Sequence, residues 1–211
     1  MRIPLLKEAN GNIARSEQER KDMIAEAAIH YGQFLKALGF DWSQDPNSES
    51  TPHRVAKAWV NDIARGSMIE KPSITQFPNG GYTGIVFQGN IKVVSLCSHH
   101  NLAFTGVAHL AYVPKKKGKV IGLSKLNRIV DWYSRRPQIQ EGLTQQIADE
   151  LNKLIDNDGI AVVLACNHSC CSNRGIGHDS TMQTAVMRGF FLKNQEGIKD
   201  EFYRMVAELK R

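Results

Sequence analysis

The chain has 211 residues and a mass of 23.6 kDa, which suits one large domain or one domain with a small attachment. Hydrophobic residues make up 42% and charged residues 23%, close to the average of folded proteins, so disorder as the main state is excluded. The net charge of +6 favours an anionic partner without identifying it. No apolar run approaches the ~20 residues of a membrane helix, and residues 1–10 lack the pattern of a secretory signal, so we expect a cytoplasmic protein without a membrane partner.

The beginning of the chain has helical patterns. Ser16 is expected to cap a first helix, with Glu19 in the capping-box position and apolar residues recurring at helical spacing over the following turns. A polar, turn-rich stretch follows. A second helix is expected to start at Thr51, because Pro52 then occupies the first helical position. We therefore expect an N-terminal helical region over residues 1–70.

The remaining residues, 71–211, mix strand and helix patterns and are expected to form one domain. The strand-like segments are apolar or β-branched runs bounded by turn residues, and they cover residues 82–88, 91–96, 102–113, 160–165 and 181–192. The helical segments carry apolar residues at helical period, with Ser124 capping the first, and they cover residues 124–132, 138–157 and 196–209. Strands that precede and follow helices in this way indicate an α+β fold.

Cysteine and histidine residues gather in two places. Four cysteines are too few for a disulfide scaffold in a chain of this length. Cys97 and His100 follow a strand-like segment at a spacing that lets one tight turn present both side chains to a zinc ion. The second half of such a site would lie in residues 166–171. Spacing alone does not count the ligands, so a four-ligand structural site and a three-ligand catalytic site stay open, as does a packing role for a cysteine such as Cys166.

Two other protein classes fit parts of this pattern. A zinc-stabilised nucleic-acid-binding module would explain the positive charge, but it needs a fourth ligand and a basic helix or an aromatic platform. The sequence has no basic helix face, and its lysine cluster, residues 115–119, is expected to form an exposed hairpin turn. A zinc deaminase would need His-x-Glu and Cys-x-x-Cys motifs, and neither occurs around Cys97 or Cys170.

Five segments occur in a fixed order that is far more specific than one Cys-x-x-His pair. They read TPHRVAK at 51–57, CSHH at 97–100, VIGLSKLNRIV at 120–130, RPQIQE at 136–141, and HSC at 168–170 followed by RG at 174–175. Together they resemble the signature motifs of the GTP cyclohydrolase I family.

The resemblance implies both an activity and an architecture. The activity is a zinc-dependent hydrolysis of a cyclic amidine C–N bond that opens the purine ring of GTP, releases formate and rearranges the product to 7,8-dihydroneopterin triphosphate. The architecture is a tunnelling fold, in which antiparallel sheets with packed helices form a barrel upon assembly of a homodecamer. Active sites then lie between subunits. The expected partners are GTP and further copies of the chain, with no nucleic acid.

Carried over residue by residue, the motifs assign three kinds of role. The implied zinc ligands, which leave a fourth position for water, are Cys97, His100 and Cys170. The implied catalytic residues, which transfer protons or act at the ribose ring oxygen, are His99, His168 and Ser124. The implied contacts to guanine are Gln140 and Glu141, with Glu141 as the anchor, and those to the ribose and triphosphate are Lys125, Arg128 and Arg174.

The chain departs from the family pattern at three positions near these residues. Gly142 stands where an arginine is usual, Ser172 replaces a residue that is often larger or basic, and Cys171 adds a thiol next to Cys170. None of the three is an implied zinc ligand or the guanine anchor. A catalytically idle relative that acts as a scaffold is disfavoured because the implied ligands are intact.

Overall fold

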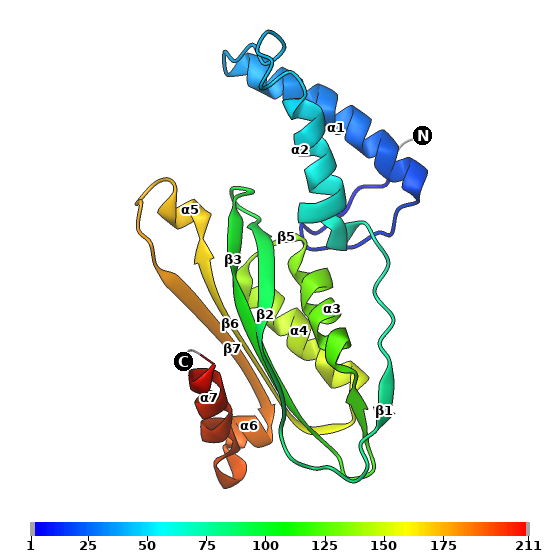
Figure 1. Cartoon of the computed structure of the whole chain (residues 1–211), viewed down its shortest axis with the longest axis vertical. Coiled ribbons are helices and arrows are strands. Elements are labelled where there is room, and N and C mark those ends of the chain that lie inside the picture. The colour runs from blue at the N-terminus through cyan, green and yellow to red at the C-terminus, as the bar shows by residue number, and fades with distance from the viewer. Residues whose placement is uncertain (1–2, 210–211) are drawn as a thin grey trace. The chain divides into compact units, whose positions relative to one another are not determined.

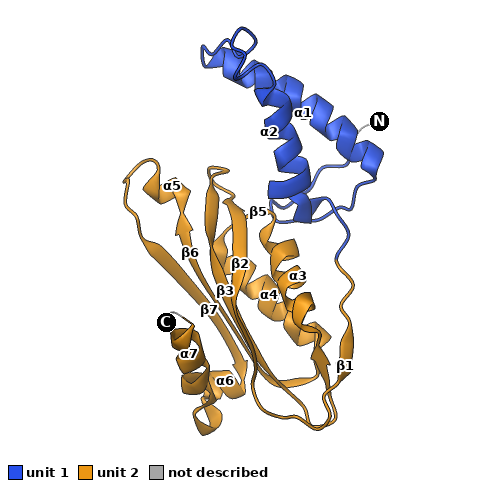
Figure 2. Ribbon diagram, viewed as in Figure 1, with its two compact units in different colours: residues 1–71 blue, residues 72–211 orange. Residues whose placement is uncertain are grey.

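The structure, a computed structural model, describes residues 3–209 of the chain. It divides into two compact units, Met1–Lys71 and Pro72–Arg211, which are described separately (Figure 2). The first is helical and the second combines a sheet with helices, so the predicted α+β class is confirmed. Within the described residues, no helix is both long and apolar enough to cross a lipid bilayer.

The first unit is built on two packed helices (Figure 1). Its elements are α1 (Glu17–Ala37), α2 (Thr51–Ala58), the π-helical η1 (Trp59–Ile63) and the 3-10 helix η2 (Arg65–Ser67). The predicted capping box is confirmed, because Ser16 Oγ accepts from the Glu19 backbone N–H while the Glu19 carboxylate accepts from the Ser16 N–H. The helices bury a small apolar core of Ile24, Ala56 and Val60. This packing gives the N-terminal region a small apolar core of its own.

The second unit is built on a five-stranded sheet with the order β5-β2-β3-β6-β7 (Figure 1). The strands are β2 (Val86–Cys97), β3 (Ala103–Pro114), β5 (Pro137–Gln138), β6 (Asn157–His168) and β7 (Thr181–Gly189). All neighbours pair antiparallel except β2 and β5, which are parallel. A separate two-stranded ribbon pairs β1 (Gln76–Pro78) with β4 (Lys119–Ile121).

Both faces of the central strands are buried. The helices of this unit are α3 (Leu123–Ser134), α4 (Gln140–Leu154), α5 (Ser169–Ser172), α6 (Phe190–Lys193), η3 (Gln195–Gly197) and α7 (Ile198–Glu208). Leu110 and Tyr112 of β3 lie in the core formed with α3 and α4, whereas Ala111 and Val113 lie in the core formed with α6 and α7. Successive side chains of a strand point to opposite faces, so two buried faces produce continuous apolar runs like the one predicted around residues 160–165.

One predicted strand boundary is wrong. The sequence predicted two strands, 82–88 and 91–96, but β2 is continuous from Val86 to Cys97. Its register against β3 shifts between Gln88 and Ile91, and Asn90 has a φ of 53°. The two residues between them therefore form a bulge, after which pairing resumes.

Other predicted ends are corrected by local geometry. The N-cap of α3 is Gly122, and Ser124 lies inside the first turn. The next helix begins at Gln140, because Pro137–Gln138 pairs with β2 as β5. The last strand ends at Gly189, whose φ of 55° leads the chain into α6.

The lysine-rich run is an exposed turn but not the predicted hairpin. It leads from β3 into β4, and β4 pairs with β1 and not with β3. Lys115 Nζ lies 2.9 Å from Asp156 Oδ1, and both side chains are exposed. An exposed ion pair contributes only about 0 to 1 kcal/mol, so this turn adds little to the free energy of unfolding.

Candidate metal centre and active site

Two segments that are far apart in the sequence meet at one end of the five-stranded sheet (Figure 1). They are the β2–β3 turn and the junction between β6 and α5. Phe104 at the start of β3 pairs with His168 at the end of β6, and α5 follows directly with Cys170 in its single turn. Antiparallel pairing of β3 with β6 therefore brings the two cysteine- and histidine-containing segments together.

A tight turn presents Cys97 and His100 from the same loop. The backbone N–H of Cys97 donates to Leu102 O at 2.8 Å, and that of Asn101 donates to Cys97 O at 2.8 Å. Asn101 has a φ of 54°, a left-handed conformation that asparagine tolerates better than most residues. The loop thus reverses direction immediately after β2, with both side chains at the sheet end.

Cys97, His100 and Cys170 form a group that could hold a metal ion. One ligand atom of each residue lies within 4.8 Å of those of the other two. Cys97 is buried, Cys170 is half-buried and His100 is exposed, so the group opens toward solvent on one side. Two thiols and one imidazole suit zinc, and three protein ligands leave a fourth position for water or substrate. The residues present therefore fit a catalytic zinc site.

The thiols of this group are crowded. Burial, followed by the neighbouring Cys97 and Cys171 thiols, raises the pKa of Cys170 to about 11. A metal binds the thiolate form of cysteine, and a divalent cation strongly stabilises that form. A cation bound by Cys97 and Cys170 would therefore supply the positive charge that stabilises the thiolate form of both side chains.

Polar side chains surround His100 and Cys97 on the exposed side. His99 is exposed, and its Nδ1 lies 3.7 Å from Cys97 Sγ. Arg174, from the loop after α5, places Nη1 2.9 Å from His100 Nε2. A guanidinium only donates hydrogen bonds, so the imidazole nitrogen is the acceptor. One of the predicted triphosphate contacts therefore lies at the candidate metal group within the same chain.

His168 is held on two sides. Its ring stacks on Phe104, with centroids 4.6 Å apart and planes inclined by 8°. Its Nε2 lies 2.8 Å from Gln140 Oε1. Burial lowers the pKa of His168, and the Glu141 carboxylate partly opposes this by raising it. The half-buried ring is therefore both oriented and biased toward its neutral form.

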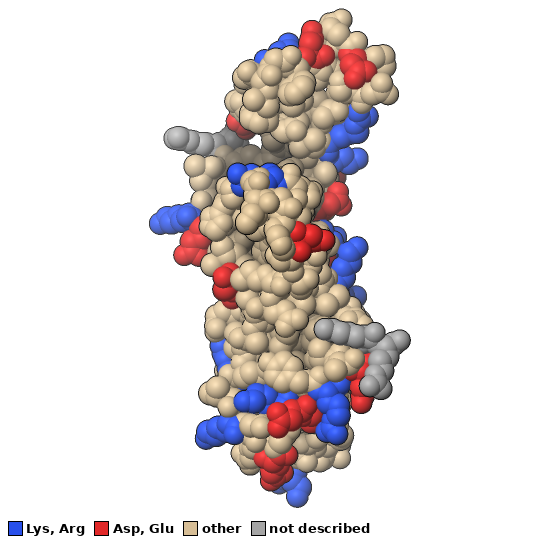
Figure 3. Space-filling view, turned by 90° about the vertical axis from the view of Figure 1, so that its left-hand side faces the viewer, with Lys and Arg blue, Asp and Glu red and all other residues tan. Residues whose placement is uncertain are grey.

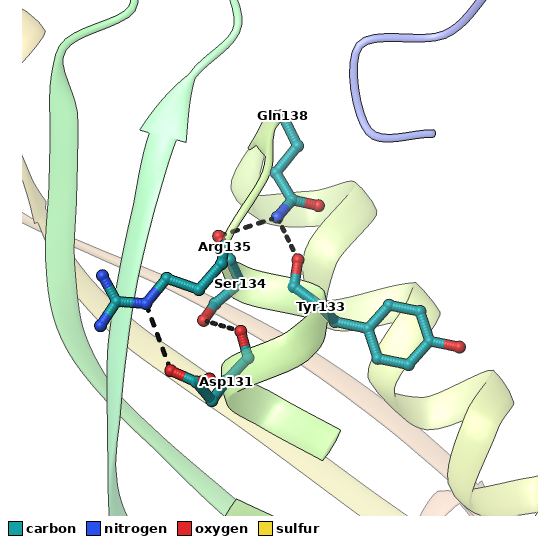
Figure 4. Close-up of polar contacts among 5 residues, drawn as sticks. All are labelled: Asp131, Tyr133, Ser134, Arg135 and Gln138. Atoms are coloured by element: carbon teal, nitrogen blue, oxygen red, sulfur yellow. Dashed lines mark hydrogen bonds and ion pairs between the residues drawn. The ribbon is translucent and has the colours of Figure 1, made fainter. Parts of the chain in front are cut away.

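The segment that leads into α4 is fixed beside Cys97. Gln138 pairs with Cys97 between β5 and β2, and the Ser98 N–H donates to Gln138 O at 3.1 Å. Figure 4 shows the buried Gln138 side chain at the end of α3, where Nε2 donates to Tyr133 O at 2.7 Å and to Ser134 O at 3.4 Å. The last carbonyls of a helix have no partner within the helix, so this amide both ends α3 and anchors the start of the next segment.

Gln140 and Glu141 begin α4 next to this anchor, and their environments differ. Gln140 is buried, and its carboxamide contacts His168, as described above. Glu141 is exposed in the first turn of the helix, where a negative charge interacts favourably with the helix dipole. Of the two residues predicted to contact guanine, Glu141 is therefore the one whose side chain is available to a ligand.

Three other predicted site residues lie on the first two turns of α3, namely Ser124, Lys125 and Arg128. This helix starts after Ile121, whose backbone N–H donates to Tyr112 Oη at 2.9 Å. Tyr112 is eight positions along β3 from Phe104, about 27 Å at ~3.4 Å per residue. The structure therefore brings His99, His168, Gln140, Glu141 and Arg174 to the metal group of one chain, but leaves the start of α3 at the other end of the sheet.

The three departures from the family pattern have different surroundings. A methyl group at Gly142 would have Ile139 Cγ1 as its nearest neighbour, at 3.6 Å, so a side chain fits there. Ser172 Oγ donates to Asn173 Oδ1 at 3.0 Å. Cys171 is exposed. None of these three residues belongs to the candidate metal group.

Some residues that contact the site had no signal in the sequence. Phe104 lies opposite His168, while Thr144 and Thr184 bond to Gln140. A phenylalanine or threonine in an apolar segment is read as a packing residue. For Phe104 and Thr184, the relation to the site depends on which residues pair across strands, and only the register of β3 with β6 and of β6 with β7 shows that. Thr144 instead bonds to the Gln140 carbonyl one turn earlier in α4.

Comparisons with known proteins cover most of the chain. A family model described as GTP cyclohydrolase I matches residues 26–207. The protein named GTP cyclohydrolase 1 of Pseudoalteromonas atlantica is 40% identical over 197 residues, which cover 88% of this chain and 100% of that protein. The protein of the same name from Streptomyces coelicolor is 41% identical over 193 residues, covering 90% of this chain and 91% of that protein. The matched residues include the metal group and every site residue described above.

Proposed function

The chain belongs to the GTP cyclohydrolase I family, and from this premise we propose that it opens the purine ring of GTP, releases formate and forms 7,8-dihydroneopterin triphosphate. GTP cyclohydrolase activity itself follows from the family and from the names of its relatives. The observation that carries the fuller proposal is the group of Cys97, His100 and Cys170 with His168 two positions before Cys170. This arrangement combines metal ligands with a proton-transferring side chain, as hydrolysis of a C–N bond requires.

We propose zinc as the metal, held by Cys97, His100 and Cys170. Thiolate and imidazole ligands favour zinc over the harder cations that oxygen ligands select. When bound, zinc supplies Lewis acidity and lowers the pKa of water at the open position from its high value in bulk water to about 7. Thiolate ligands persist in a reducing compartment, so we also propose that the enzyme acts in the cytoplasm.

The histidines supply the proton transfers in this proposal. His168 donates a proton to a departing purine nitrogen and recovers it in a later step. Burial lowers the pKa of His168, so the ring is neutral at rest and must take up a proton before it acts as the acid. The protonated ring then gives this proton up readily because burial disfavours its charge. His99 is exposed beside Cys97 and serves the second transfer or orients the attacking water.

Glu141 is the proposed guanine anchor. Guanine presents two N–H donors along one edge, at N1 and at the 2-amino group, and an ionised carboxylate is a pure acceptor that can take both. Glu141 is exposed at the sheet end that carries the metal group, and its charge acts on His168. A carboxylate in that place supports binding of the base close to the proposed acid.

The triphosphate is the proposed partner of Arg174, Lys125 and Arg128, and Ser124 acts at the ribose ring oxygen. Arginine forks suit bidentate contacts with phosphate oxygens. Arg174 already lies at the metal group, whereas the other three residues begin α3 at the opposite end of the sheet. We therefore propose that a neighbouring subunit supplies Ser124, Lys125 and Arg128 to each site.

The sheet edges support assembly into a larger ring. Among the described residues, β7 is paired along one edge only, with β6, and β5 covers β2 only at Leu96 and Cys97. Unpaired strand edges readily accept another strand. We propose that these edges join between subunits into the barrel of a tunnelling fold, within a homodecamer.

The alternative, a zinc-stabilised nucleic-acid-binding module, has less support. The metal group found among residues 3–209 has three members, not the four of a closed structural site. On the face drawn in Figure 3, lysines and arginines are interspersed with aspartates and glutamates and form no continuous basic stripe. The lysine turn is partly neutralised by Asp156.

The direct test of the proposed function is product identification. Purified protein is incubated with GTP, the products are oxidised, and pterin fluorescence and formate are measured. We expect one formate released per pterin formed. Pterin without formate, or no change in GTP, would contradict the proposed reaction.

A further inference from the structure

Gln140 is a buried polar residue at the edge of the candidate site. Its side chain is 1% exposed, although it adjoins the exposed Glu141. A buried carboxamide is costly unless its donors and acceptor are satisfied. The partners of Gln140 therefore show what the side chain does.

The orientation of this carboxamide is determined by its surroundings. Nε2 lies 3.3 Å from Leu164 O, 3.1 Å from Met182 O and 3.1 Å from Thr184 Oγ1. Backbone carbonyls only accept hydrogen bonds, so the NH2 group must face them. The oxygen, Oε1, is consequently the atom that faces His168.

A closed ring of hydrogen bonds reinforces this orientation. Thr144 Oγ1 donates to the backbone carbonyl of Gln140 at 2.8 Å. Thr144 Oγ1 also lies 2.6 Å from Thr184 Oγ1, and because its own hydrogen is already used, Thr184 is the donor there. The lone pairs of Thr184 then accept from Gln140 Nε2. The ring runs from the Gln140 side chain through both threonines back to the Gln140 backbone, so rotating the amide would break it.

The Gln140 carboxamide has one acceptor atom, Oε1, and this atom faces His168. Gln140 Oε1 lies 2.8 Å from His168 Nε2. An amide oxygen cannot donate, so Nε2 must carry a hydrogen, and in the neutral ring the lone pair is on Nδ1. Stacking on Phe104 fixes the ring plane, while the hydrogen bond fixes the rotation within that plane.

We infer that Gln140 is a positioning residue, which holds the ring of His168 in one orientation and one tautomer because the backbone carbonyls of Leu164 and Met182 turn its side-chain oxygen toward Nε2. This inference rests on the proposed function for the role of His168 in turnover. It differs from the role that the family resemblance implies for Gln140, in which the residue holds guanine. The two roles predict different kinetics.

The test compares Gln140→Met with Thr144→Val. Methionine keeps the length and approximate volume of glutamine but removes every side-chain hydrogen bond. Thr144→Val breaks the same ring on the side away from His168, while the carbonyls of Leu164 and Met182 still orient the amide. Thermal unfolding is measured for both variants, together with kcat and KM for GTP.

We expect Gln140→Met to lower kcat roughly 10- to 100-fold, the usual cost of removing a partner that orients a functional histidine. KM for GTP should change little, and Thr144→Val should keep kcat near the wild-type value even though its unfolding temperature falls. In a His168→Ala background, Gln140→Met should cause no further loss, because residues that act as a unit are not additive. A raised KM at unchanged kcat, additive effects with His168→Ala, or a kcat that follows the unfolding temperature in both variants would overturn the inference.

A spectroscopic measurement is independent of turnover. In zinc-loaded wild-type protein labelled with 15N-histidine, NMR should show the hydrogen of His168 on Nε2. A hydrogen on Nδ1 with a bare Nε2 would overturn the inference even if Gln140→Met failed to fold. If wild-type protein did not convert GTP, the proposed function would fail, and this spectrum would still decide whether Gln140 sets the tautomer.

Discussion

The Cys170 thiol lies close to the thiols of Cys97 and Cys171 and to the imidazole of His100. Burial and the neighbouring thiols raise the pKa of Cys170 to about 11, which disfavours the thiolate in the absence of a cation. Cys171 is next in the chain but is exposed, and the group of ligand atoms within 4.8 Å does not include it. We therefore expect the two adjacent cysteines to have different roles, and replacing each in turn separates them.

We expect Cys170→Ala to lose both bound zinc and GTP turnover, because two protein ligands hold the metal far more weakly than three. Cys171→Ala is the matched control and should keep about one zinc per chain. Zinc content is measured by atomic emission after gel filtration. Loss of zinc from the control and retention in Cys170→Ala would reverse the assignment.

Glu141→Gln tests recognition of the base. Glutamine keeps the shape of the side chain but removes its charge. Its NH2 group would also face the N1 or 2-amino hydrogens of guanine, so two donors would meet. A hydrogen bond to a charged group contributes ~1.5 to 3 kcal/mol, so GTP binding should weaken roughly ten- to a hundredfold. Wild-type protein should also reject ATP, since adenine lacks the N1 hydrogen. Similar turnover of GTP and ATP by the wild type would remove Glu141 from this role.

At the level of elements, the pairing of β3 with β6 determines whether the site forms at all. Gly106 lies opposite Cys166 in this pairing, two positions from Phe104. A methyl group at Gly106 would overlap the backbone of Ala165. Close contact between the two strands therefore requires glycine at this position.

Gly106→Ala should lower the free energy of unfolding by about 1 to 3 kcal/mol or more, the range found for overpacked cores, because a backbone cannot move aside like a flexible side chain. Gly142→Ala is the contrasting variant. It has space for a methyl group in α4 and should raise stability by up to about 1 kcal/mol through helix propensity. Urea unfolding measures both, and equal stability of the two variants would contradict the close approach of β3 and β6.

Sequence prediction succeeded where a feature depends on neighbouring residues and failed where it depends on a distant strand. The capping box of α1 and the apolar runs of β3 and β6 were predicted because they depend on neighbouring residues. The start of α4 was missed because β5 forms only through pairing with a distant strand. The carbonyl partners of the Gln140 amide were missed for the same reason, since they come from β6 and β7.

At the scale of the whole molecule, the residues proposed to form one site lie at opposite ends of the sheet in a single chain. The metal group lies at one end of the sheet, and the residues that begin α3 lie near Tyr112 at the other end. Within residues 3–209, the outer edge of β7 and the part of β2 before Leu96 have no second strand paired to them, which offers a route for joining subunits. Motifs in the sequence identify both sets of residues, but the spacing of the motifs does not show whether the two sets meet within one chain or between two chains.

Mixing of subunits tests whether each site combines the metal group of one chain with the α3 residues of another. Lys125→Ala and Cys170→Ala should each be nearly inactive, but oligomers that contain both variants should recover roughly a quarter of wild-type turnover, because random mixing in a symmetric assembly leaves that share of sites intact. Mixing Cys97→Ala with Cys170→Ala is the control and should recover nothing, since both residues belong to one metal group. Absence of recovery in the first mixture would indicate a site formed within a single chain.

The most direct test of the central claim is a zinc titration of metal-free protein, with bound zinc and pterin formation from GTP measured on the same samples. We expect turnover to be absent without metal, to rise in proportion to bound zinc, and to reach its plateau at about one zinc per chain. Full turnover in the metal-free protein, or saturation with zinc without any pterin, would contradict the assignment of Cys97, His100 and Cys170 as the catalytic metal site of a GTP cyclohydrolase.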